Sequence, residues 1–162
     1  SHSASCGETQ LALLAAKWSE EGISFEEICH KLTDYRDHMK TYFVLNNLDT
    51  LRKNGRLSGV KALVASTLSI KPVMGSDKGE IIQLAQAIGI KKGLAKMAEM
   101  VGKEAVRPEE RTLMITHCNC PERAESVKKM ILEKIKVKEA LVMDTRGVSS
   151  MYANDGGVIV TL

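Results

Sequence analysis

The sequence predicts an α/β (α+β) domain, in which helices pack against a mixed, largely antiparallel sheet. Three observations support this class: helical periodicity over residues 8–38, a hairpin pattern over residues 68–87, and an alternation of strand, helix and strand in the second half. A chain of 162 residues can bury one sizeable core, and no internal repeat or linker divides it. We therefore expect residues 1–162 to form a single domain.

The first two elements are expected to be helices joined by a tight turn. Residues 8–22 form the first helix, and Gly22 is a typical C-terminal stop. Ser24 is a typical N-cap for the second helix, and Glu27, three residues later, completes a capping box. The apolar faces are formed by Leu11, Leu14, Ala15 and Trp18 in the first helix and by Phe25, Ile28, Leu32 and Tyr35 in the second.

The next segment is expected to begin with a strand and to continue as short helices. Residues 41–45, TYFVL, are rich in residues that favour β-structure. Leu48 and Leu51 form the inner face of a short helix, which ends at Gly55 because glycine readily adopts the conformation that terminates a helix. Residues 59–67 are expected to form another helical segment.

The rest of the chain is expected to supply most of the sheet. Residues 68–75 and 80–87 pair as a hairpin through the turn at 76–79. Pro72 cannot donate a ladder hydrogen bond, so the first of these strands lies at a sheet edge or leaves the ladder there. The other expected elements are a helix at 91–104, a strand at 111–117, a helix at 121–135 that begins at Pro121, a strand at 139–145 and a last strand at 156–162.

Composition and charge argue against several classes of partner. The net charge of +3 is small, and charged residues of opposite sign alternate along the predicted helices. This pattern does not favour nucleic-acid binding. No apolar run approaches the roughly 18 residues of a membrane span. The four cysteines, Cys6, Cys29, Cys118 and Cys120, do not form a disulfide framework, so free thiols in a reducing cytoplasm are expected.

Arg56 is the first candidate for a binding residue. It follows a glycine-terminated helix and precedes a capping serine, where a guanidinium can bind a carboxylate or phosphate through two hydrogen bonds. Backbone N–H groups of the following helix would add to the favourable field. A structural role is the alternative, in which Arg56 caps the carbonyls of the preceding helix or pairs with Asp49.

Other reactive residues do not form a recognisable site. If His117–Cys120 continued a strand, Cys118 and Cys120 would face away from His117, and no second ligand pair has zinc-site spacing. Cys6 begins a helix but has no obvious base, so a buried structural role is expected. No phosphate loop and no defensible acid–base pair occurs, and we expect neither catalysis nor a cofactor.

Several motifs, in their order along the chain, resemble the second (C-terminal) domain of the DegV family, bacterial proteins that bind a long-chain fatty acid. The opening SASCGETQLALLAAKWSEEGISFEEI, which resembles the segment leaving the first domain, is followed by YFVLNNLDTLRKNGRLS and LSIKPVM with its SDKG turn. RTLMITHCNCPERAESVKKMI and the closing DGGVIVTL complete the resemblance over nearly the whole chain. The family's N-terminal domain is expected to be absent from this chain.

The resemblance implies a function and a set of binding residues. Family members hold the fatty acid between two domains; the first binds the carboxylate and the second covers the acyl chain. Some present the fatty acid to a separate kinase and are carriers, not catalysts. The ligand-binding residues implied here are Arg56 near the polar end, Phe43, Leu68 and Ile70 along the acyl chain, and Ala153 and Asn154 before the closing glycine turn.

Two departures from the family pattern leave alternatives open. Family members commonly carry a histidine before the closing glycine turn, where this chain has Tyr152 or Ala153. A K-A-R-G stretch commonly follows the hairpin, where this chain has residues 86–89, QAIG. The alternative function is an interaction or regulatory domain that kept the fold and lost the ligand, and a phosphotransfer enzyme ranks last. A domain that supplies half of a binding site is also expected to self-associate.

Overall fold

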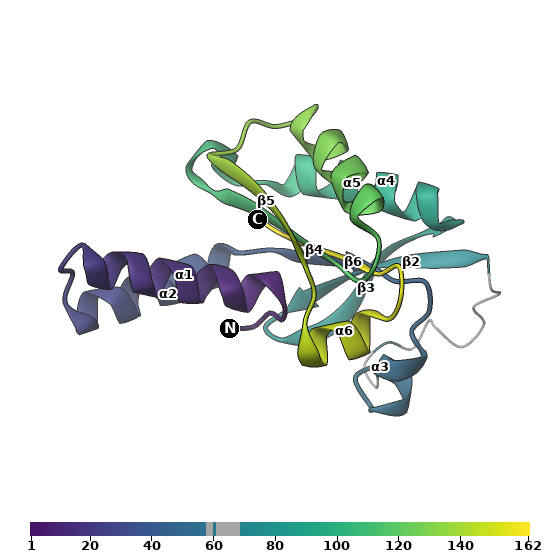
Figure 1. The fold of residues 1–162 in the computed structure, drawn as a ribbon, viewed down its shortest axis with the longest axis horizontal. Coiled ribbons are helices and arrows are strands. Elements are labelled where there is room, and N and C mark those ends of the chain that lie inside the picture. Colours follow the sequence, from purple (N-terminus) through teal and green to yellow (C-terminus); the bar gives the residue numbers. More distant parts are fainter. Residues whose placement is uncertain (58–59, 61–68) are drawn as a thin grey trace.

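The computed structural model describes residues 1–57, 60 and 69–162. Its described strands form a six-stranded sheet in the order β3-β2-β1-β6-β4-β5, with helices on both faces (Figure 1). The helices are α1 (Cys6–Glu20), α2 (Phe25–His38), α3 (Asp49–Lys53), α4 (Ile90–Glu104), α5 (Pro121–Leu132) and α6 (Gly147–Ala153), with a short 3-10 helix at Pro108–Glu110. The strands are β1 (Thr41–Val44), β2 (Ile70–Asp77), β3 (Glu80–Ile88), β4 (Thr112–His117), β5 (Glu139–Asp144) and β6 (Val158–Thr161).

The sheet is mixed and mostly antiparallel, which confirms the predicted fold class. β1 pairs antiparallel with β2 on one side and with β6 on the other. β3 and β4 add antiparallel neighbours, whereas β5 pairs parallel with β4. A parallel neighbour requires a crossover, and α5 supplies it between β4 and β5.

The helical pair α1 and α2 extends from one end of the sheet (Figure 1). The turn between them confirms the Gly22 stop, with a φ of 77°, and the Ser24 cap, whose side chain accepts a hydrogen bond of 3.3 Å from the Glu27 backbone N–H. The Glu27 carboxylate lies 3.9 Å from Lys31 Nζ, so the structure records only the serine half of the predicted capping box. One assignment to the apolar face was wrong. Phe25, at the first position of α2, is 81% exposed.

The prediction that Pro72 marks an edge strand was also wrong. β2 is an interior strand, between β3 and β1. Its pairing with β1 covers only Tyr42 with Gly75 and Phe43 with Met74. Pro72 therefore lies beyond the ladder with β1, so the second alternative holds on that side only, because Pro72 still pairs with Gln86 of β3.

The second half follows the predicted order of elements, with one addition. The sequence indicated only a short connection after the strand at 139–145, whereas the chain forms α6 there. This helix has seven residues, begins at Gly147 and has no side-chain cap hydrogen bond. It therefore lacks the capping and length signals by which a helix is recognised in a sequence. The helix expected at 59–67 lies outside the described residues, apart from Val60.

Two apolar clusters occupy the two faces of the sheet. The larger lies between the sheet and helices α4 and α5, and it includes Val44, Val73, Met97, Ile115 and Ile131. The smaller lies on the opposite face, below α3 and α6, and we call it the site cluster: Phe43, Leu45, Leu51, Met74 and Ala153. β1 alternates between them, because Tyr42 and Val44 face one cluster and Phe43 and Leu45 face the other.

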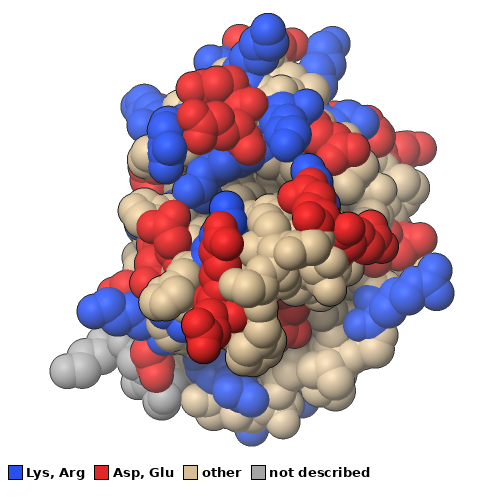
Figure 2. Space-filling view, turned by 90° about the vertical axis from the view of Figure 1, so that its left-hand side faces the viewer, with Lys and Arg blue, Asp and Glu red and all other residues tan. Residues whose placement is uncertain are grey.

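The surface agrees with the charge pattern of the sequence. Figure 2 shows Lys and Arg side chains intermingled with Asp and Glu over the face that it presents. Within the described part of the chain, no helix combines the length and the apolar character that crossing a membrane requires.

Candidate functional site

The candidate site lies at the end of the sheet where β1 leads into α3 and where α6 leads into β6 (Figure 1). Arg56 lies just after α3. Gly55, with a φ of 69°, turns the chain out of the helix, and the Arg56 backbone N–H donates to the Leu51 carbonyl at 2.9 Å. This backbone bond closes the helix, so the Arg56 side chain is not needed as its cap.

The guanidinium of Arg56 is available to a ligand. Asp49, the partner that the structural alternative named, instead pairs with Arg52 at 2.5 Å. Arg56 is exposed, and its side chain makes no hydrogen bond or ion pair with any residue that the structure describes. A free guanidinium beside an apolar surface can bind the carboxylate of an amphipathic ligand.

The site cluster lies next to the chain segment that carries this arginine, and it brings two predicted site residues together. Phe43 and Ala153 both belong to it, at 9% and 1% exposure, although β1 and α6 are far apart in the sequence. Leu57, the residue after Arg56, packs against the same cluster, which joins the charged position to the apolar one. An exposed cation thus lies one residue from a buried apolar cluster.

The other predicted site residues are placed less directly. Ile70 is half-buried at the start of β2, paired with Ile88, and is not a member of the site cluster. Asn154 follows α6 with a φ of 56°, and its side-chain oxygen accepts a hydrogen bond of 3.1 Å from the Thr50 hydroxyl. This bond ties α6 to α3. Leu68 lies outside the described residues.

A polar network that sequence reasoning missed holds the site loop in place. Arg123 Nη1 donates to Asn46 Oδ1 at 3.1 Å and to the Gly156 carbonyl at 2.8 Å. Lys71 Nζ donates to the Asn46 carbonyl at 2.6 Å, and Asn46 Nδ2 donates to the Asp155 carbonyl at 2.7 Å. Asn46 thus connects β1 to the turn before β6. No local pattern indicates this, because the partners come from four distant segments.

Gly156 is required by this network. Its φ is 81°, a conformation that glycine adopts without strain. A Cβ atom at this position would overlap Asn46 Nδ2 and lie 2.5 Å from Arg123 Nη1. The neighbouring Gly157 is equally confined, because its Cβ would lie 2.8 Å from Leu45 and overlap the Ala153 carbonyl. The closing glycine pair therefore permits close packing of the turn on the site loop.

The His117–Cys120 segment forms the end of a strand and the entry to a helix. β4 ends at His117, so Cys118 and Cys120 lie in a turn, and the strand alternation considered for them does not apply. Their thiols are directed to the carbonyls of Ser150 and Gly157, at 4.0 and 3.5 Å. Among the described residues, no group of three His, Cys, Asp or Glu side chains is arranged to hold a metal.

The pKa values of two thiols also argue against a nucleophile at these positions. Burial raises the pKa of Cys6, which is fully buried under the sheet as expected, and burial is the main cause that raises the pKa of Cys120. A raised pKa lowers the fraction of reactive thiolate at neutral pH. Both residues therefore serve the packing of the fold.

Sequence comparison with known proteins gives a consistent result. The family model of uncharacterised proteins of the DegV family matches residues 1–161. A DegV domain-containing protein from Clostridium perfringens is 36% identical over 137 residues, which cover 84% of this chain and 47% of the relative. One from Streptococcus pyogenes is 35% identical over 144 residues, which cover 86% and 49%. The chain spans about half the length of the curated relatives it matches.

Solved structures share the fold. A DegV family protein from Ruminococcus gnavus, described with vaccenic acid, is 48% identical with a TM-score of 0.95, over 99% of this chain and 58% of that one. One from Eubacterium eligens, loaded with heptadecanoic acid, is 26% identical with a TM-score of 0.80, over 93% and 54%. The fatty acid kinase (Fak) B3 protein of Streptococcus pneumoniae, loaded with linoleic acid, is 27% identical with a TM-score of 0.80, over 93% and 53%. The family match over residues 1–161 and these relatives show that the chain belongs to the DegV family.

Proposed function

We propose that this chain is a lipid-binding domain that covers the acyl chain of a bound long-chain fatty acid and has no catalytic activity of its own. The observation that carries the proposal is the exposed Arg56, without a side-chain partner among the described residues, one residue before Leu57, which packs against the site cluster. The fatty acids named for the relatives from Ruminococcus gnavus, Eubacterium eligens and Streptococcus pneumoniae support the ligand class.

The chemistry of the site suits such a ligand at both ends. A carboxylate can accept two hydrogen bonds from one guanidinium, a geometry that a lysine ammonium cannot reproduce. Each methylene of an acyl chain that leaves water for an apolar surface contributes about 0.8 kcal/mol. The length of the chain thus supplies affinity, and Arg56 fixes the orientation.

The partners of this domain belong to the same proposal. The relatives are about twice as long as the match to them, which supports a first domain that binds the carboxylate and closes the site. A domain without that partner leaves apolar side chains exposed on α6, with Val148 at 67% and Met151 at 50%, which favours self-association. A cytoplasmic location is consistent with the four free cysteines.

Presentation of the fatty acid to a separate kinase is the finer part of the proposal. Similarity to the Fak B3 protein supports it. The surface at the end of β3 argues against presentation to a kinase. Ile88, which is 70% exposed, occupies the position where the family pattern has an arginine. A kinase that recognises this chain would need contacts other than that cation.

Replacement of Arg56 distinguishes the carrier from an interaction domain that has lost its ligand. Arg56→Ala in the full-length protein removes the charge-assisted hydrogen bonds to the carboxylate, and we expect the affinity for vaccenic acid to fall about tenfold or more. Lys53→Ala is the matched control, since it removes one exposed cation three residues away, at the end of α3. Competition with a fluorescent fatty acid measures both affinities. Equal affinities in the two variants would favour the interaction domain.

A further inference from the structure

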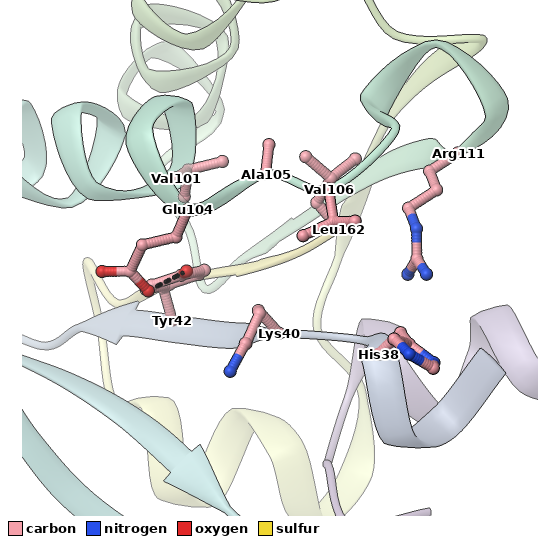
Figure 3. A pocket seen from close by; sticks show the side chains of 9 residues that line it. All are labelled: His38, Lys40, Tyr42, Val101, Glu104, Ala105, Val106, Arg111 and Leu162. Atoms are coloured by element: carbon pink, nitrogen blue, oxygen red, sulfur yellow. Dashed lines mark hydrogen bonds between the residues drawn. The ribbon is translucent and has the colours of Figure 1, made fainter. Parts of the chain in front are cut away.

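A second cationic site lies at the opposite end of the sheet from Arg56. There, a small pocket of about 10 Å³ is lined by His38, Lys40, Tyr42, Glu104 and Arg111, among others (Figure 3). Lys40 immediately precedes β1 and Arg111 immediately precedes β4, whereas Arg56 lies beyond the far end of β1. We call these lining residues the basic pocket. None of the functions considered above uses it.

Arg111 is a buried cation with an incomplete set of partners. It is only 7% exposed, and its Nη1 atom is buried without an acceptor among the described residues. Its guanidinium lies 4.9 Å from the centre of the Tyr35 ring, a contact that favours the cation but supplies no hydrogen-bond acceptor. A buried, charged N–H group without an acceptor is costly, so an oxygen atom from outside the protein, of a water molecule or of an anion, is the expected partner.

The acidic side chains nearby are already engaged. Glu104 Oε2 accepts a hydrogen bond of 2.8 Å from the Tyr42 hydroxyl, and Figure 3 shows this carboxylate turned toward Tyr42 and away from Arg111. Asp34 lies 3.4 Å from His38 Nδ1, which leaves Nε2 of that ring for another partner. Lys40 is exposed and makes no ion pair with the residues that the structure describes. The pocket thus carries an excess of positive charge.

We propose that the basic pocket binds a small oxyanion, the phosphate or carboxylate group of a ligand. A volume of about 10 Å³ admits about one oxygen atom, so one anion oxygen enters toward Arg111 and the remainder stays outside the pocket, on the side of His38. Figure 3 shows the Arg111 guanidinium pointing toward His38, whereas the Lys40 ammonium is turned away from both of them. Arg111 provides hydrogen bonds and Lys40 provides charge.

The test is a titration of the full-length protein with inorganic phosphate and, separately, with acetate, at constant ionic strength, followed by backbone NMR shifts. The proposal expects saturable shifts at Lys40, Arg111 and Leu162 with at least one anion, and the anion that binds more tightly identifies the ligand group. Lys40→Glu should weaken this binding about tenfold or more. Lys92→Glu, the same reversal at an exposed position of α4, should change it less than twofold.

Several outcomes would overturn the proposal. Saturation by neither anion at millimolar concentration excludes the site, and so do shifts confined to other parts of the protein. Equal weakening by Lys40→Glu and Lys92→Glu would show that the anion responds only to overall charge. Lys40→Glu decides the result because Lys40 is exposed, whereas Arg111 is buried.

Discussion

Gly156→Ala is expected to destabilise the protein by about 3 kcal/mol or more, a large fraction of the stability of an ordinary domain. An alanine Cβ would overlap Asn46 and press on Arg123, and the backbone would hold a non-glycine residue at a φ of 81°. The turn can avoid the overlap only by breaking the hydrogen bonds that Asn46 and Arg123 make with it. Urea denaturation monitored by circular dichroism measures the change in the free energy of unfolding.

Gly22→Ala separates the two causes of this loss. Gly22 has a similar φ of 77°, but no heavy atom lies within 4 Å of the position that its Cβ would take. Backbone strain alone predicts a cost of about 1 kcal/mol. If Gly156→Ala costs no more than Gly22→Ala, the polar network does not hold the turn as we describe.

Phe43→Ala is expected to cost about 3–5 kcal/mol of stability, because it removes a buried aromatic side chain from the centre of the site cluster. Phe25→Ala is the matched control, since the same substitution is made at a position that is 81% exposed. The control should change the free energy of unfolding by less than about 0.5 kcal/mol. Parallel denaturation curves measure both.

The Phe43 variant also tests the role of the site cluster in binding. If Phe43 supports the floor of the fatty-acid site, the folded fraction of the variant should bind vaccenic acid more weakly than Phe25→Ala does. Similar stability losses in the two variants would contradict the burial of Phe43. Unchanged binding by folded Phe43→Ala protein would remove Phe43 from the site while leaving its structural role intact.

Local signals in the sequence predicted most of the fold. The Gly22 stop, the Ser24 cap and the Pro121 start each depend on backbone chemistry within a few residues, and all three appear in the structure. The edge-strand alternative for Pro72 and the burial of Phe25 were wrong because both depend on how elements pack in three dimensions. Helix α6 was missed because tertiary contacts, not capping or periodicity, stabilise it.

In the candidate site, too, residues with a local sequence signal could be predicted and residues that depend on tertiary contacts could not. Arg56 could be singled out because a helix end, a glycine and a cation are adjacent in the sequence. The Asn46–Arg123–Gly156 network could not, since only the arrangement of β1, β6 and α5 brings these residues together. No sequence pattern marked Arg111 as a binding residue either. Its significance depends on burial next to Tyr35, which a single sequence does not reveal.

The most direct test of the central claim is native mass spectrometry of the full-length protein, delipidated under mild conditions and then exposed to micromolar vaccenic acid. We predict an increase in mass equal to one fatty acid per chain. The methyl ester of the same acid should bind more weakly, because it cannot present a carboxylate to Arg56. If no adduct forms while a fatty-acid-binding DegV protein treated identically is loaded, the lipid-binding account of this chain is wrong.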